Sequence, residues 1–153
     1  MEVYQLSRRK FTDNLSGKGS SLKGARWNST GVELIYSASN RSLAMAEVAV
    51  HLTLATLPID YVMMAVFIPD DISVQKINLS DLPSNWNTFP HPANTQVIGN
   101  KFVSENKYCI IQVPSSVIKG DFNILINPNH PEFTKIRIIS IDRFPFDERI
   151  FKI

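Results

Sequence analysis

The most regular pattern of apolar residues lies in the first half of the chain. Four of them recur there at the three- and four-residue spacing of one helix face: Leu43, Ala46, Val50 and Leu54. Asn40 or Ser39 can cap the N-terminus of such a helix, and Pro58 cannot continue it. We therefore predict a helix over residues 41–56.

Apolar runs before and after this helix predict strands. The run at residues 61–68 is continuous and closes at Pro69, so it predicts an interior strand. Shorter apolar or alternating runs predict further strands, at residues 2–6, 32–37, 76–79, 108–113, 123–126 and 135–141.

Glycine, serine and proline mark the segments between these elements. Residues 16–23 are predicted to form a flexible loop, and the proline-rich residues 82–92 an irregular segment. A second helix is expected over residues 95–104, with Gly99 inside it. Because strands with short turns dominate the second half, we predict an α+β fold and not a doubly wound one. The length of 153 residues fits a single domain, residues 1–153.

Composition narrows the classes of partner and ligand. The formal net charge of +2 is too small to indicate a nucleic-acid partner, and no apolar stretch approaches transmembrane length. The N-terminus lacks the basic start and apolar run of a signal peptide, so we expect a cytoplasmic protein. Cys109 is the single cysteine, and its place in an apolar run predicts that it is buried in a strand. His91 and His130 lack the spacing of zinc ligands, so no metal site is expected.

Glu47 is the first residue whose context suggests chemistry. Between Ser42 and Ile59 it is the only Asp, Glu, Lys or Arg, in a segment rich in Ala, Val and Leu. A buried carboxylate needs a partner, an open cleft or a shifted pKa, and His51 lies one helical turn further on as a candidate partner. Glu47 is equally well explained as the one polar residue on an exposed stripe.

Arg26 follows a glycine-containing loop and precedes Trp27 and Asn28. A guanidinium held by such a loop suits contact with phosphate, although an arginine stacked on Trp27 gives the same pattern. Tyr36 ends the following predicted strand, and its ring either packs in the core or lines a cleft. Ser115 and Ser116 follow a proline, a usual position for turn serines, and no Gly-x-Ser-x-Gly elbow is present.

Taken in order, these motifs resemble the RES domain, a family named for an arginine, a glutamate and a serine. The resemblance runs from about residue 3 to residue 149. It rests on seven segments: Gly24-Ala25-Arg26-Trp27-Asn28, Gly31, Ile35-Tyr36-Ser37, Leu43-Ala44-Met45-Ala46-Glu47, Val50-His51-Leu52, Val113-Pro114-Ser115 and Asn127-Pro128 with His130.

The resemblance implies a fold similar to the ADP-ribosyltransferase toxins, with a split, twisted β core and surrounding helices. It implies the toxin half of a bacterial toxin–antitoxin pair that cleaves the nicotinamide–ribose bond of NAD⁺, as a phosphorylase or glycohydrolase. Alternatives are a protein ADP-ribosyltransferase toxin and a non-catalytic module that binds only its antitoxin. The expected partners are NAD⁺, phosphate and an Xre-like helix-turn-helix antitoxin. No Rossmann fingerprint is present, so NAD⁺ is expected as substrate, with no resident cofactor.

The same resemblance assigns the site residues. Glu47, Arg26, Tyr36 and Ser115 match the family's catalytic residues, whereas Gln5 stands where many members have arginine. The expected contacts to NAD⁺ come from six residues: Arg26, Tyr36, Trp27, Asn28, Ser115 and Asn127.

Overall fold

The computed structural model describes residues 1–151. Within them the chain forms seven strands, three α-helices and five 3₁₀ helices. The strands are β1 (Glu2–Arg8), β2 (Ile35–Ala38), β3 (Tyr61–Phe67), β4 (Val74–Lys76), β5 (Ile110–Pro114), β6 (Phe122–Ile126) and β7 (Arg137–Arg143). The α-helices are α1 (Lys18–Lys23), α2 (Arg41–Ala49) and α3 (Ala93–Glu105). The 3₁₀ helices are η1 (Arg9–Phe11), η2 (Leu54–Thr56), η3 (Leu79–Asp81), η4 (Pro131–Lys135) and η5 (Glu148–Phe151).

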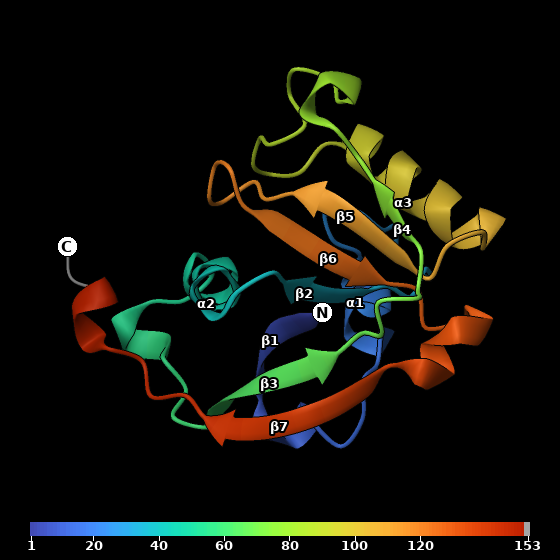
Figure 1. Cartoon of the computed structure of the whole chain (residues 1–153). Helices are drawn as coiled ribbons and strands as arrows, with labels where there is room; N and C mark the ends of the chain where they lie inside the picture. Colours follow the sequence, from blue (N-terminus) through green and yellow to red (C-terminus); the bar gives the residue numbers. More distant parts are fainter. Residues whose placement is uncertain (152–153) are drawn as a thin grey trace.

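All seven strands belong to one sheet, in the order β4-β5-β6-β2-β1-β3-β7 (Figure 1). Strands β4 and β5 are parallel, and the other neighbours are antiparallel. Every residue of β1 pairs with β3, but β1 meets β2 only at the pair Tyr4 and Ala38. The sheet is therefore split into two parts, β4-β5-β6-β2 and β1-β3-β7. The predicted α+β class with a split β core is confirmed.

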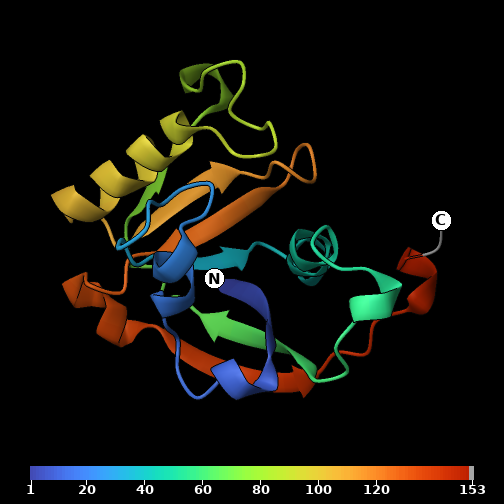
Figure 2. The ribbon, with the colours of Figure 1, turned by 180° about the vertical axis from the view of Figure 1, so that it is seen from behind.

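Residue alternation along the strands sends apolar side chains to both faces of the first part. Ile111 and Leu125 face the cluster formed with Trp27 and Phe102 of α3, whereas their neighbours face a second cluster. Figure 2, from behind, shows α1 and the chain that follows it in front of the sheet, beside α3. Because both faces of these strands are buried, their sequences are continuous apolar runs and do not alternate in polarity.

Helix α2 covers the second part of the sheet through Leu43 and Ala44, which pack on Leu6 of β1 and Met63 of β3. Its N-terminus is capped as predicted, because the backbone N–H of Leu43 donates to Asn40 Oδ1 at 2.8 Å.

The predicted end of this helix at residue 56 is wrong, since α2 ends at Ala49. The N–H groups of His51 and Leu52 bond only three residues back, to the carbonyls of Val48 and Ala49. Thr53 then starts the separate 3₁₀ helix η2 with its own capping box. The local turn, and not the helical spacing of Leu54, thus decides where α2 ends.

Residues 16–23 were predicted as a loop, but Lys18–Lys23 form α1. Contacts from outside hold this glycine-containing helix: Ser20 Oγ donates to the Leu34 carbonyl at 2.6 Å, and Asn28 Nδ2 to the Ser20 carbonyl at 3.0 Å. Tertiary bonds here override poor helix propensity.

The predicted strand at residues 76–79 is also displaced. It lies at Val74–Lys76, where it pairs in parallel with β5, and Leu79–Asp81 form η3 instead. The predicted helix over 95–104 is confirmed as Ala93–Glu105.

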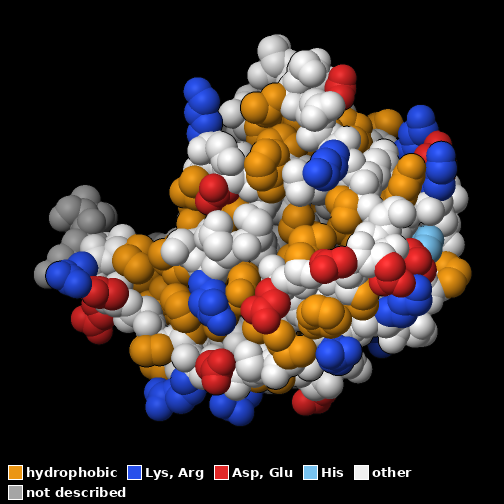
Figure 3. Space-filling model, in the orientation of Figure 1, with side chains coloured by type: hydrophobic (Ala, Val, Ile, Leu, Met, Phe, Trp, Pro, Cys, Tyr) orange, Lys and Arg blue, Asp and Glu red, His pale blue; other side chains and the backbone are white. Residues whose placement is uncertain are grey.

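The surface carries both signs of charge. On the face seen in Figure 3, Lys and Arg side chains alternate with Asp and Glu side chains, and hydrophobic side chains gather between them.

Candidate functional site

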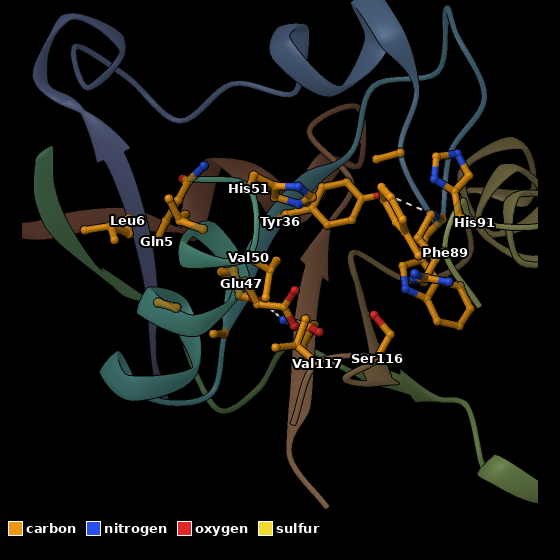
Figure 4. A pocket seen from close by; sticks show the side chains of 18 of the residues that line it. Gln5, Leu6, Tyr36, Glu47, Val50, His51, Phe89, His91, Ser116 and Val117 are labelled. Carbon is orange, nitrogen blue, oxygen red and sulfur yellow. Dashed lines mark hydrogen bonds between the residues drawn. The ribbon is translucent and has the colours of Figure 1, made fainter. Parts of the chain in front are cut away.

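A cavity of about 790 Å³ opens where the two parts of the sheet meet. Strand β1 contributes Gln5 to its wall, β2 contributes Tyr36, α2 contributes Glu47, and the turn after α2 contributes His51 (Figure 4). The single pair that joins β1 to β2 leaves this gap between the two parts of the sheet. Its volume lies in the upper part of the range of about 300–1,000 Å³ for small-molecule sites.

Glu47 is half-buried in the cavity wall and is held by a serine from the other part of the sheet. The buried hydroxyl of Ser115, just after β5, donates to Glu47 Oε1 at 2.8 Å. The same oxygen accepts the backbone N–H groups of Val117 and Ile118, both at 3.0 Å. Because those donors occupy the lone pairs of the hydroxyl, its one proton goes to the carboxylate. The serine therefore orients Glu47 as a hydrogen-bond acceptor.

Arg26 reaches the cavity from the loop after α1. Its Nη1 donates to the backbone carbonyls of Trp86 at 2.7 Å and Thr88 at 3.0 Å. Burial lowers the pKa of the Arg26 guanidinium, and the nearby Glu47 and Tyr36 oppose that shift. An arginine remains charged in any such setting, and the two backbone carbonyls that accept from it are neutral. The cavity wall thus carries a cation suited to an anionic ligand.

Tyr36 lines the cavity, and its hydroxyl takes part in two hydrogen bonds. The hydroxyl donates to Asn28 Oδ1 at 2.6 Å and accepts the N–H of Trp27 at 3.1 Å. Burial raises the pKa of Tyr36 above its usual range, so the phenol stays neutral. Its hydroxyl fixes the Arg26 loop, and its ring remains for contact with a ligand.

The structure brings most of the residues named from the sequence to one place. Arg26, Trp27, Tyr36 and Glu47 line the cavity, and Ser115 reaches it through Glu47. Asn28 is completely buried and supports Tyr36 from behind.

Asn127 is not brought to this cavity. It is completely buried, its Nδ2 donates to Asn106 Oδ1 at 2.9 Å, and its Oδ1 accepts the N–H of Asn129. The arrangement makes Asn127 a support for the turn after β6.

Another wall of the cavity comes from a segment that the sequence did not indicate. Asn87, Phe89 and His91 line the cavity from the irregular segment before α3, and Phe89 is 79% exposed. Nothing in their local pattern indicates a cavity. His51 also lines it, but the hydrogen-bond partner of Glu47 is Ser115 and not His51.

Two features are absent from residues 1–151. They contain no group of three or more His, Cys, Asp or Glu residues placed to hold a metal ion. None of the helices in this part of the chain has the length and hydropathy needed to cross a membrane.

Fold and site together define a class of protein: an α+β domain whose split sheet holds a serine-bound carboxylate and an arginine in one cavity. The chain belongs to the RES domain family, whose domain matches residues 2–147. The resemblance inferred from the ordered motifs is thereby confirmed.

Several relatives match over most of their length. The chain is 31% identical to the "Prs ADP-ribosylating toxin" of Sphingobium sp. (strain YBL2), over 92% of this chain and 88% of that one. It is 31% identical to "Toxin Res" of Yersinia enterocolitica, over 98% and 99% of the two chains. With "Toxin Res" of Photorhabdus laumondii it shares 32% identity, over 99% and 98%.

The fold also occurs in a solved structure. A chain of the M. tuberculosis MbcT–MbcA toxin–antitoxin complex superimposes with a TM-score of 0.74 at 16% sequence identity. The match covers 98% of this chain and 86% of that chain, and it shows a shared fold.

Proposed function

We propose that this chain is a toxin that consumes NAD⁺ by cleaving the nicotinamide–ribose bond, with phosphate or water as acceptor. The observation that carries the proposal is the cavity in which Arg26 and Tyr36 lie with Glu47, whose carboxylate is oriented by Ser115. The names of the relatives, all toxins, support the toxin role.

Glu47 has the main role in the proposed chemistry. As nicotinamide leaves with the bonding electron pair, positive charge develops on the ribose, as in glycoside hydrolysis. A fixed carboxylate near the ribose hydroxyls stabilises that charge, and partial burial strengthens the interaction by lowering the local dielectric. Phosphate or water then bonds to the ribose carbon, and an attacking water releases its proton to the solvent.

Arg26 and Tyr36 would hold the substrate in reach of Glu47. The guanidinium suits the pyrophosphate, which is an anion with oxygen acceptors. The ring of Tyr36 offers a surface for the nicotinamide or the ribose, and Trp27 lies beside Arg26 in the same wall. In this proposal NAD⁺ is a substrate, and the reaction requires no resident cofactor.

A partner follows from the toxin role. We expect a cognate antitoxin of the helix-turn-helix, Xre-like kind, in the cytoplasm. The similar fold in the MbcT–MbcA toxin–antitoxin complex supports a protein partner for this chain as well.

The reaction is tested with purified protein, free of antitoxin, incubated with NAD⁺ in buffers with and without phosphate. Chromatography follows nicotinamide release. Release accelerated by phosphate supports a phosphorylase, and release independent of phosphate supports a glycohydrolase. Absence of release in both buffers contradicts the proposal.

A second candidate function is ADP-ribosylation of a protein, which one relative's name favours: the "Prs ADP-ribosylating toxin". Labelled ADP-ribose would then be transferred from NAD⁺ to a protein in a lysate. Free ADP-ribose or its phosphate as the sole product would count against it. If the chain is harmless when expressed without antitoxin and releases no nicotinamide, it is a non-catalytic binding module.

A further inference from the structure

The segment between η3 and α3 contributes backbone carbonyls to the site. The carbonyls of Trp86 and Thr88 both accept from Arg26 Nη1. This guanidinium group is therefore fixed by a loop that is distant in sequence, 60 residues away in the case of Trp86 and 62 in the case of Thr88. The position of Arg26 depends on whatever fixes that loop.

Two contacts give the loop its local shape. The N–H of Thr88 donates to the Asn85 carbonyl at 3.2 Å, and Thr88 Oγ1 donates to the same carbonyl at 3.0 Å. The rings of Trp86 and Trp27 lie 6.3 Å apart between centroids. Asn85 is thus the residue on which the turn carrying Thr88 is built.

Asn94, in the first turn of α3, connects this turn to the body of the protein. Its Nδ2 donates to Asn85 Oδ1 at 2.8 Å. The Oδ1 of Asn94 is buried without a hydrogen-bond partner among the described residues. An unpaired buried acceptor costs free energy, so packing alone does not account for an amide at this position.

The next two residues of α3 hold the backbone on either side of Arg26. Thr95 Oγ1 donates to the Arg26 carbonyl at 2.7 Å, and Gln96 Nε2 donates to the carbonyls of Ala25 at 3.0 Å and Asn28 at 3.1 Å. The first turn of α3 therefore holds both the backbone of Arg26 and the loop that binds its side chain.

From this arrangement we infer that Asn94 is a positioning residue for the anionic group of the substrate. Through Asn85 it fixes the two carbonyls that orient the Arg26 guanidinium. The nature of that anion, the NAD⁺ pyrophosphate, rests on the proposed function. A guanidinium held in place before binding loses less side-chain entropy when it meets a phosphate. Loss of the Asn85–Asn94 bond is expected to raise KM and to leave kcat unchanged, since Glu47 and Ser115 contact neither residue.

Two single variants and their combination test the inference. Asn94→Ala and Asn85→Ala are each expected to raise the KM for NAD⁺ about 2- to 10-fold, the range of a lost hydrogen bond. The kcat is expected to stay within about 2-fold. The KM of the double variant is expected to be no higher than that of the single variant with the higher KM, because both changes remove the same bond. Additive effects on KM, or a fall in kcat with unchanged KM, overturn the inference.

Asn106→Gly supplies the matched control. It removes a bond of the same kind, from Asn127 Nδ2 to Asn106 Oδ1 at 2.9 Å, at a residue outside the cavity. Glycine fits there, since Asn106 has a φ of 51°. This variant is expected to lose stability without a change in KM.

Amide hydrogen exchange gives a readout independent of turnover. The N–H groups of Trp86 and Thr88 donate to the Pro83 and Asn85 carbonyls. Exchange in the peptide covering residues 83–92 is expected to accelerate in Asn94→Ala and Asn85→Ala, but not in Asn106→Gly. Unchanged exchange in the first two variants overturns the inference. Failure of the unaltered protein to turn over NAD⁺ overturns the proposed function instead, and the exchange result still decides whether Asn94 holds the loop.

Discussion

Ser115 and Glu47 are 68 residues apart in the sequence and are joined by a 2.8 Å hydrogen bond from hydroxyl to carboxylate. The bond links the residue just after β5 to the last turn of α2. It ties a residue of one part of the split sheet to the helix that covers the other. The carboxylate therefore has a fixed direction in the cavity before any ligand arrives.

Replacement of this carboxylate tests its role. Glu47→Gln keeps an acceptor oxygen for Ser115 and removes the charge, so the fold is expected to persist. Turnover of NAD⁺ is expected to fall about 10²–10³-fold or more, the usual effect of removing one electrostatic contact to a transition state. Nicotinamide release measures the change, and circular dichroism checks the fold. Glu105→Gln, at an exposed glutamate of α3, is the control and is expected to retain full activity.

The serine is tested by its own truncation. Ser115→Ala leaves the Val117 and Ile118 N–H groups without their acceptor and frees the Glu47 side chain. Stability is expected to fall by about 1–3 kcal/mol, the cost of unpaired polar groups, and kcat is expected to fall as well. Urea unfolding and initial rates measure the two effects. Ser116→Ala is the comparison, and an equal loss in both variants would contradict the assignment of Ser115.

Gly99 is predicted to be irreplaceable for steric reasons. A Cβ at this position would lie 1.6 Å from the Trp27 carbonyl oxygen, so α3 and the Arg26 loop could not keep their contact. Gly99→Ala is expected to destabilise the fold by about 1–3 kcal/mol or more, which outweighs the gain of about 0.5–1 kcal/mol in helix propensity.

Gly19→Ala in α1 separates the steric clash from the gain in helix propensity. A Cβ there has no neighbour within 4 Å, so only the propensity gain of about 0.5–1 kcal/mol remains. Chemical unfolding of both variants is the measurement. A stable Gly99→Ala protein would mean that the helix and the loop are less closely packed than described.

Cys109 gives a pH dependence with a defined sign. The side chain is completely buried, and burial raises the pKa of its thiol to about 12. In the unfolded chain a thiol ionises near pH 8.5, so above that pH the unfolded state gains a charge that the fold excludes. The contribution to stability is complete below about pH 8.5 and is lost as pH rises toward about 12.

Unfolding in urea with reductant, at several pH values from 7 to 10, measures this effect. The alkaline loss of stability is expected to be smaller in Cys109→Ala than in the unaltered protein. The difference in slope is at most about 1.4 kcal/mol per pH unit. Equal slopes would show that the thiol does not titrate differently in the two states.

Much of this fold could be predicted from the local order of apolar, polar and capping residues. The capped helix at Asn40, the buried run that became β3, and the helix around Gly99 were each predicted from the local order of polar and apolar residues. The end of α2 at Ala49 and the formation of α1 were not. A tight turn decides the first, and Leu34 and Asn28 decide the second through bonds to Ser20.

The sequence alone singled out Glu47, because a lone charge in an apolar helix must be explained, and the order of its motifs indicated the RES family. The fold decided which group forms a hydrogen bond with Glu47. His51 lies one turn away, yet the partner is Ser115. The fold also directed the carbonyls of Trp86 and Thr88 at Arg26 and placed Asn127 outside the cavity. These relationships join residues tens of positions apart. Periodicity reports only which face of an element is apolar, whereas the packing of the two sheet parts sets which faces meet.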